Sequence, residues 1–310
     1  MNTFQGELQE WGPEALADRS RPPSVDEARD YCRQLARGHY ENFSVVSWLL
    51  PKHLHQHFYN VYAYCRWADD LGDEIDDADR SLELLGWWRS HLQQCHAGEA
   101  QHPVFVALHT TIQEFAIPIN PFGDLISAFE QDQRIIEYAT FEQLLGYCRC
   151  SADPVGRIVL YLCRQNRPET FEWSDSICTG LQLANFWQDV ARDLDIGRIY
   201  LPEEDRLRFG YSREDLDARV TNDAFLELMR FQVERARTFF DTRRQLVECL
   251  PFRLQVDIDL FGEGGLKILD RIERIGFRVW ETRPVVTKAD AFSMLIGSLC
   301  RAVLRRVGLK

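Results

Sequence analysis

Apolar residues recur every three or four positions along most of this chain, a spacing that places them on one face of an α-helix. The clearest case begins at residues 24–27, Ser-Val-Asp-Glu, which form a capping box. Its apolar stripe is Val25, Ala28, Cys32 and Leu35. Pro51 opens a second helix, as prolines often do. The same spacing predicts further helices over residues 81–95, 103–115, 121–134, 141–164, 175–195, 223–249, 265–281 and 289–306.

Strand signals are weak, because no run of residues alternates cleanly between apolar and polar positions. Segments 196–222 and 250–264 show no regular pattern, and we expect them to be irregular. No repeat or long linker divides the chain. The pattern therefore predicts one all-α domain over residues 24–310, preceded by a flexible N-terminal segment over residues 1–23.

The chain has 310 residues, of which 45% are hydrophobic and 27% charged, a composition typical of globular proteins. The net charge of −12 argues against a general nucleic-acid binder, which needs a basic surface. The charge is uneven, since residues 271–310 hold nine Lys and Arg against three Asp and Glu, a net of +6. Nine scattered cysteines without a C-x-x-C motif are typical of reduced thiols, so we expect a cytoplasmic protein.

Two of the predicted helices each carry a pair of aspartates four residues apart. The first polar stripe reads Tyr62, Arg66, Asp69 and Asp73, and the second reads Gln182, Asn185, Asp189 and Asp193. Like charges at this spacing destabilise a helix, and buried carboxylates cost more unless a cation compensates them. Oxygen ligands on widely spaced residues suit Mg²⁺, which usually bridges to substrate phosphates. The alternative is a solvated acidic helix end without a metal.

The segments around these pairs, residues 61–74 and 181–193, resemble the two D-x-x-x-D regions of the squalene/phytoene synthase family. Residues 197–202, Asp132-Gln133, Tyr147 and Val155-Gly156 are also similar to that family, and the resemblance covers about residues 30–290. It implies an all-α isoprenoid-synthase-type bundle around a central cavity. It also implies aspartates that hold Mg²⁺ on the diphosphate of a prenyl substrate.

The resemblance further implies a role for each residue of the stripes. The metal would be held by Asp69, Asp73, Asn185, Asp189 and Asp193. The diphosphate or its metal shell would be contacted by Tyr62, Arg66, Gln182, Asn185, Arg198 and Tyr200, and the substrate also by Tyr147. Metal and arginine together neutralise the charge that develops on a departing diphosphate, which allows it to leave.

The start of the family region departs from the usual H-S-x-S-F pattern. This chain has His39, Tyr40, Glu41, Asn42 and Phe43 there, which we expect to contact the substrate. A second departure is Gln188, which stands where the family usually has an arginine.

The same start, together with residues 264–269 and Arg283-Pro284, resembles one branch of the family. That branch converts presqualene diphosphate to hydroxysqualene in bacterial hopanoid pathways, with capture of the carbocation by water and no need for NADPH. We hypothesise that Tyr40, Glu41 and Asn42 place this water. The alternative is that they only rebuild the phosphate pocket.

Other functions stay open on the sequence. Within the family they are a squalene synthase that uses NADPH and a presqualene diphosphate synthase that acts on farnesyl diphosphate. Outside it they are a non-catalytic prenyl-lipid-binding subunit and a helical partner-binding protein. In the preferred interpretation, a separate presqualene diphosphate synthase hands over the substrate.

The helix predicted over residues 289–306 is amphipathic and basic. Its apolar side comprises Phe292, Leu295, Leu299 and Val303, and its basic residues are Arg301, Arg305, Arg306 and, beyond the helix, Lys310. This pattern predicts peripheral contact with anionic lipid on the inner face of the membrane. The alternative is that the apolar side packs on the domain. We interpret His53, His55 and His57 as surface histidines rather than zinc ligands.

Overall fold

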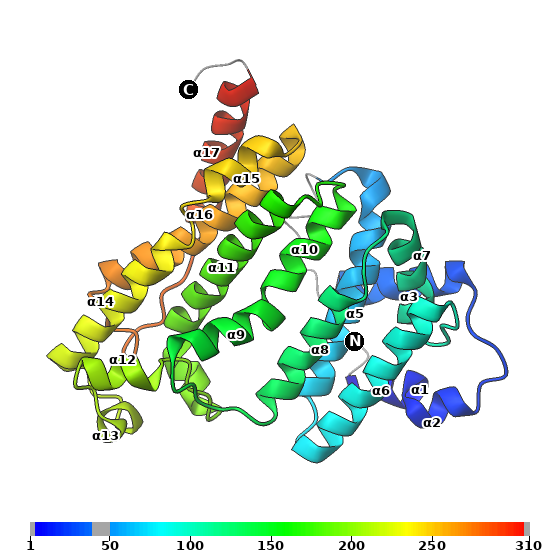
Figure 1. Cartoon of the computed structure of the whole chain (residues 1–310), viewed down its shortest axis with the longest axis horizontal. Coiled ribbons are helices and arrows are strands. Elements are labelled where there is room, and N and C mark those ends of the chain that lie inside the picture. The colour runs from blue at the N-terminus through cyan, green and yellow to red at the C-terminus, as the bar shows by residue number, and fades with distance from the viewer. Residues whose placement is uncertain (1–3, 39–49, 307–310) are drawn as a thin grey trace. The chain divides into compact units, whose positions relative to one another are not determined.

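The computed structural model describes residues 4–38 and 50–306, and these residues are mostly helical (Figure 1). Within these ranges the only β-type pairing is an isolated bridge between Glu137 and Ile199, so the all-α prediction is confirmed. The chain divides into two compact units, Met1–Arg134 with Ile158–Asn166, and Ile135–Arg157 with Arg167–Lys310. The one domain that we expected over residues 24–310 includes parts of both units.

The first unit is built around α5. Its elements are α1 (Phe4–Trp11), α2 (Pro13–Ala17), α3 (Val25–Gly38), the 3₁₀ turn η2 (Lys52–Leu54), α5 (His55–Asp73), α6 (Ala78–Ala97), α7 (Pro103–Phe115) and α8 (Asn120–Asp132). Helices α3, α6, α7 and α8 all pack against α5. On α5 the Tyr64 hydroxyl donates to the Phe122 carbonyl at 2.7 Å, and Trp67 stacks on Trp88 with ring centroids 5.2 Å apart. Burying each such large side chain stabilises the unit by about 1.5–3 kcal/mol.

The second unit is built around α11. Its elements are α9 (Phe141–Ser151), α10 (Asp153–Leu162, whose end belongs to the first unit), α11 (Pro168–Asp195), α12 (Glu203–Arg208), α13 (Arg213–Asp217), α14 (Asp223–Thr238), α15 (Arg243–Cys249), α16 (Phe252–Arg274) and α17 (Lys288–Arg306). Helices α9, α14, α15 and α16 pack on α11. The contact with α16 is close, because a Cβ atom on Gly265 would lie only 2.9 Å from the Leu181 side chain.

Part of the N-terminal segment is helical, although we expected flexibility over residues 1–23. Residues 4–17 form α1 and α2, and they bury Trp11 and Leu16. Phe4 packs edge-on against Trp67 of α5, with ring centroids 5.4 Å apart. These helices are too short to show a clear periodic pattern, and tertiary burial is what stabilises them.

The capping box at the start of α3 is confirmed. The Ser24 N–H donates to the Glu27 carboxylate at 2.8 Å, and the Glu27 N–H donates back to the Ser24 hydroxyl at 3.3 Å. The stripe that follows is shifted from the prediction. Val25 is exposed and Leu35 only half-buried, while Ala36 is buried with Ala28 and Cys32.

Several predicted boundaries were wrong. The helix expected over residues 141–164 is split at Ala152, because Pro154 has no N–H to continue it. The one expected over 223–249 is split between α14 and α15, and the one expected over 175–195 starts earlier, at Pro168. Segment 250–264 is helical as part of α16, and segment 196–222 contains α12 and α13. Among the described residues, no helix is both long and apolar enough to cross a membrane.

Candidate active site

The first polar stripe lies on the accessible side of α5, as its spacing predicted. Its members Tyr62, Arg66 and Asp69 are half-buried, and Asp73 is exposed. The other sides of the helix are buried against the unit through Ala63, Tyr64, Trp67, Ala68 and Leu71. The helix therefore presents its acidic end toward solvent while its remaining faces are fixed by packing.

Arg66 reaches along α5 to two carboxylates. Its Nε donates to Asp70 Oδ2 at 2.9 Å, and its Nη1 donates to Asp69 Oδ2 at 3.2 Å. Asp70 is buried, and this burial raises the pKa of its carboxyl to about 6, although the bond from Arg66 acts in the opposite direction. Asp70 is a residue that we did not predict, yet its i,i+4 spacing from Arg66 is a readable signal. Its contact holds the Arg66 guanidinium beside Asp69.

The end of α5 is held by α8. Gln133 Nε2 donates to the Gly72 carbonyl at 2.9 Å. A Cβ atom on Gly72 would lie 3.4 Å from the Phe129 ring, so the two helices approach closely at this point. Gln133 belongs to the middle segment that resembles the family. Its contact fixes the backbone immediately before Asp73.

The second polar stripe lies on a helix that is otherwise largely buried. Asn185 is exposed, while Gln182, Asp189 and Asp193 are half-buried. The remaining faces of this part of α11 are buried through Leu183, Ala184, Phe186, Trp187 and Val190. The prediction of carboxylates on a helix with apolar sides is confirmed here.

Asp189 is paired with Arg283, which lies 94 residues further along the chain. Arg283 Nη2 donates to Asp189 Oδ2 at 2.9 Å, and its Nε donates to Oδ1 of the same carboxylate. Beside it, the buried Gln188 donates from Nε2 to the Pro284 carbonyl at 2.6 Å. Gln188 therefore anchors the segment that carries Arg283. The sequence marked Arg283 only as part of a resemblance and gave no sign of this pairing.

A tight turn after α11 places Arg198 next to Asp193. Gly197 adopts a positive φ of 78°, which a residue without Cβ accepts readily. The Gly197 N–H donates to the Leu194 carbonyl at 3.0 Å, and the Arg198 N–H donates to the Asp193 carbonyl at 2.8 Å. These two bonds form a Schellman motif. The turn brings two predicted residues together that lie five positions apart.

Asp193, Arg198 and Tyr200 line one small pocket, together with Phe186, Val190, Leu194, Ile199, Leu201, Leu216 and Trp280. Tyr200 stacks on Phe186, with ring centroids 3.8 Å apart and planes inclined by 13°. Tyr147 lies 5.9 Å from Tyr200 between ring centroids and is buried. Three of the predicted residues thus share a pocket, and a fourth belongs to the aromatic cluster beside it.

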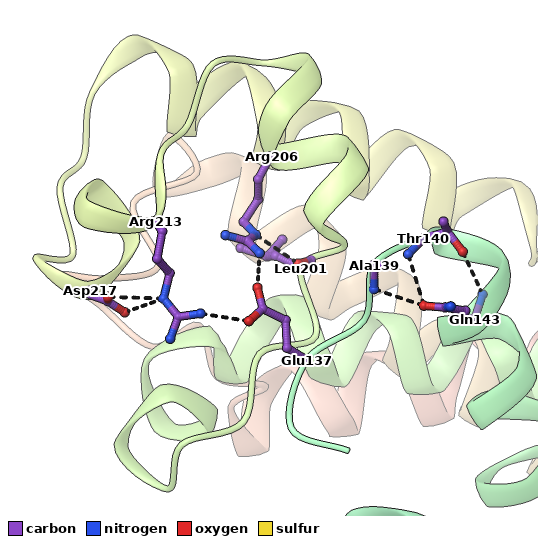
Figure 2. Close-up of polar contacts among 8 residues, drawn as sticks. All are labelled: Glu137, Ala139, Thr140, Gln143, Leu201, Arg206, Arg213 and Asp217. Atoms are coloured by element: carbon purple, nitrogen blue, oxygen red, sulfur yellow. Dashed lines mark hydrogen bonds and ion pairs between the residues drawn. The ribbon is translucent and has the colours of Figure 1, made fainter. Parts of the chain in front are cut away.

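A network of ion pairs fixes the loop that completes this cluster (Figure 2). Glu137 accepts from Arg206 through one carboxylate oxygen and from Arg213 at 2.7 Å through the other. Arg206 is only 3% exposed, and its Nε also donates to the Leu201 carbonyl at 3.3 Å. Tyr138 follows Glu137 and stacks on Tyr200, with centroids 5.9 Å apart. No pattern in the sequence marked Glu137, Arg206 or Arg213.

The predicted histidine cluster is not wholly on the surface. His57 is buried, and its Nδ1 lies 3.1 Å from the Thr111 hydroxyl while its Nε2 lies 3.4 Å from Glu114. Burial lowers the pKa of His57, which favours its neutral form. We therefore assign this histidine to the packing of α5 on α7.

The remaining predicted residues, His39, Tyr40, Glu41, Asn42 and Phe43, lie outside the described residues. Within the described part of the chain, no three or more His, Cys, Asp or Glu side chains form a cluster that could hold a metal. The carboxylate and amide oxygens of the stripes nevertheless have the chemistry that suits Mg²⁺, which is usually held by one or two carboxylates plus substrate phosphates. Metal binding stays a prediction.

The all-α fold, with an aspartate pair on each of two long helices, defines a protein of the isoprenoid-synthase type. Residues 36–290 match the model of the squalene/phytoene synthase family, and the chain belongs to this family of enzymes. The 15-cis-phytoene synthase of Synechocystis sp. is 33% identical over 85% of this chain and 82% of its own length. That of Synechococcus elongatus is 31% identical over 91% of this chain and 95% of its own length.

Solved structures agree with this assignment. The squalene synthase HpnC from Alicyclobacillus acidocaldarius superposes with a TM-score of 0.79 and 45% identity, over 82% of this chain and 95% of that protein. A dehydrosqualene synthase in complex with a ligand also gives a TM-score of 0.79, over 91% of this chain and 98% of its own. Its identity of 23% supports the fold alone.

Proposed function

We propose that this protein converts presqualene diphosphate to hydroxysqualene in a Mg²⁺-dependent reaction that releases diphosphate. The observation that carries the proposal is the pair of polar stripes, each with two aspartates and a guanidinium within reach, on a chain of this family. The choice of branch is supported by the His39–Phe43 segment. The 45% identity with a protein described as a squalene synthase, compared with 33% for the phytoene synthase of Synechocystis, favours the squalene side of the family over the phytoene side.

In the proposed reaction, the bond between the substrate carbon and the diphosphate oxygen breaks, and the diphosphate departs with the electron pair. A water oxygen then bonds to the rearranged carbocation and loses a proton. Carbon is neither oxidised nor reduced by an outside partner, so no NADPH is required. The substrate would be delivered by a separate presqualene diphosphate synthase.

Each group at the stripes has a defined task in this proposal. Asp69 and Asp73 on α5, and Asn185, Asp189 and Asp193 on α11, would hold Mg²⁺, which neutralises charge on the leaving diphosphate. Arg66 and Arg198 would add fixed positive charge as the bond breaks. Both arginines are half-buried and held in place, Arg66 by Asp70 and the backbone of Arg198 by the turn at Gly197.

The aromatic cluster suits a cationic intermediate. Phe186 and Tyr200 line the pocket that Asp193 and Arg198 also line, and Tyr147 packs beside them. An aromatic face attracts a cation through its quadrupole, by about 0.5–2 kcal/mol depending on how far water is excluded. Apolar walls next to a charged rim are what a prenyl diphosphate needs, since it joins a long hydrocarbon to an anionic head.

The test is product analysis by gas chromatography–mass spectrometry. The purified full-length protein is incubated with Mg²⁺ and presqualene diphosphate, with and without NADPH, and separately with farnesyl diphosphate. We expect hydroxysqualene without NADPH. Squalene formed only with NADPH would place the protein with squalene synthases. Presqualene diphosphate formed from farnesyl diphosphate would make it the preceding condensing enzyme.

A second candidate is a phytoene synthase, because the curated relatives at 31–33% identity carry that name. Phytoene formed from a longer prenyl diphosphate in the same assay would establish it. A non-catalytic prenyl-lipid-binding subunit would release no diphosphate with any of these substrates. An Asp189→Asn variant is the matched control, since it keeps the shape of the side chain and removes its charge.

A further inference from the structure

Helix α17 is attached to the second unit through its charged residues. Arg301 Nε donates to Asp259 Oδ2 of α16 at 2.8 Å, and Asp259 is buried. Near the other end of α17, Asp290 pairs with Arg271 at 2.5 Å and with Lys267 at 3.4 Å, both on α16. Ser298 and Ala302 on the same side are buried. The side of α17 that packs on α16 therefore carries these ion pairs.

The opposite side of α17 is apolar and accessible. Phe292 is 66% exposed and Ile296 is 46% exposed, and Cys300 one turn further on is also exposed. Residues spaced by four share one face of a helix, so these three form a continuous stripe, which we call the α17 stripe. A surface helix normally turns its apolar side inward. Here Leu295 and Leu299 are only half-buried, and the predicted apolar side is divided between the two faces.

The sequence segment that carries the stripe is basic although the protein is acidic. Residues 288–310 contain five Lys and Arg but only one acidic residue, Asp290, a net of +4. Asp290 is already matched by Arg271 and Lys267. The whole chain carries −12, so positive charge is concentrated at this end. An apolar stripe within a basic segment complements a lipid surface with anionic headgroups.

We propose that the α17 stripe docks on an anionic lipid bilayer, with Phe292 and Ile296 inserted at the level of the headgroups. Basic residues of the 288–310 segment then interact with lipid phosphates, while Asp259 retains Arg301 in its ion pair. The proposal depends only on the second unit and not on which prenyl diphosphate is the substrate. The residues differ from those predicted from the sequence. Arg301 is paired with Asp259 within the protein, and the exposed apolar side contains Ile296 instead of Leu295 and Leu299.

The experiment is co-sedimentation of the full-length protein with vesicles of phosphatidylcholine alone or with one third phosphatidylglycerol. We expect binding to the anionic vesicles that weakens as salt is raised, because salt screens the headgroup charge. The double variant Phe292→Ser/Ile296→Ser should bind at least tenfold more weakly. Since both side chains are exposed, its melting temperature should match that of the parent protein.

Matched controls distinguish docking of the α17 stripe from nonspecific adsorption of the protein to vesicles. Leu207→Ser removes an exposed leucine of α12, 70% accessible, and should leave vesicle binding unchanged. Phe292→Trp should retain binding, since tryptophan suits the membrane interface. Absence of binding by the parent protein, or equal binding by the double serine variant, would overturn the proposal. So would a dimer in gel filtration that the serine substitutions dissociate, because a second copy would then cover the stripe.

Discussion

Asp257 on α16 is a buried carboxyl that no described group compensates. It is 4% exposed, and neither of its oxygens has a hydrogen-bond partner among the described residues. Burial raises the pKa of this carboxyl to about 7, from an ordinary value of 3.8. The raised pKa means that the folded state favours the protonated form of Asp257. The contribution of this protonated carboxyl to the stability of the fold is therefore fully present below pH 4 and is lost as pH rises through 7.

We therefore expect Asp257→Asn to stabilise the protein at pH 8 by about 1–3 kcal/mol, because an amide carries no charge to bury. At pH 5 the gain should be clearly smaller, and it should disappear only near pH 4, where the unfolded chain also holds the proton. Urea unfolding at the two pH values measures the difference. An equal effect of Asp257→Asn at both pH values would mean that the carboxyl is solvated. Asp241→Asn, at an exposed carboxylate in the same unit, is the control.

Gln188 and Arg283 act together at the second aspartate pair. Gln188→Ala removes the bond to the Pro284 carbonyl and leaves Arg283 less firmly held against Asp189. Because the carboxylate itself is unchanged, we expect a several-fold rise in KM for the diphosphate substrate with a smaller loss in kcat. Steady-state kinetics measure both constants. Rescue by Gln188→Glu would contradict this role, since a carboxylate cannot donate to that carbonyl.

The polar contacts of single residues were predictable only where they are local. The stripes on α5 and α11 follow from a spacing of three and four, and that spacing is visible in the sequence. The bond from Arg66 to Asp70 follows the same rule. The pairing of Asp189 with Arg283 does not, because it joins positions 94 residues apart and only the folded chain brings them together.

One carboxylate, that of Glu137, links the loop before α9 to the segment around α12 and α13. Arg206 is almost fully buried, and Glu137 is its ion-pair partner. Removing one member of a buried ion pair leaves an uncompensated charge, which costs about 3–5 kcal/mol. We expect Glu137→Gln to lower the free energy of unfolding by ~3 kcal/mol and to weaken the stacking of Tyr138 on Tyr200.

The control for Glu137 is Asp217→Asn, which breaks the exposed pair with Arg213. Exposed pairs contribute about 0–1 kcal/mol, so little change is expected. Thermal or chemical denaturation followed by circular dichroism compares the two variants. If both lose the same stability, the burial of Arg206 is not what makes Glu137 important.

The helices themselves show what a pattern can and cannot predict. Helix α7, which starts at Pro103, was predicted with its correct bounds, and the bounds predicted for α6 and α8 lie within three residues of the observed ones. The first half of α16 was missed because Gly262 and Gly264 lower the helix propensity of this segment. Its packing on α11 and α15 overrides that preference. Helices α1 and α2 were missed because eight and five residues give too short a periodic signal.

The two aspartate pairs belong to different units of the chain, yet the proposed reaction needs both. If both pairs serve one Mg²⁺-dependent step, the effects of removing them are not independent. Asp69→Asn and Asp189→Asn should each lower kcat by about 100-fold or more, as the loss of charge stabilisation in a transition state does. The double variant should be little worse than either single variant, rather than slower by the product of the two factors. Diphosphate release under saturating Mg²⁺ measures all three, with circular dichroism to verify folding and Asp79→Asn as a control at an exposed carboxylate. A multiplicative loss in the double variant would mean that the two pairs contribute to separate steps.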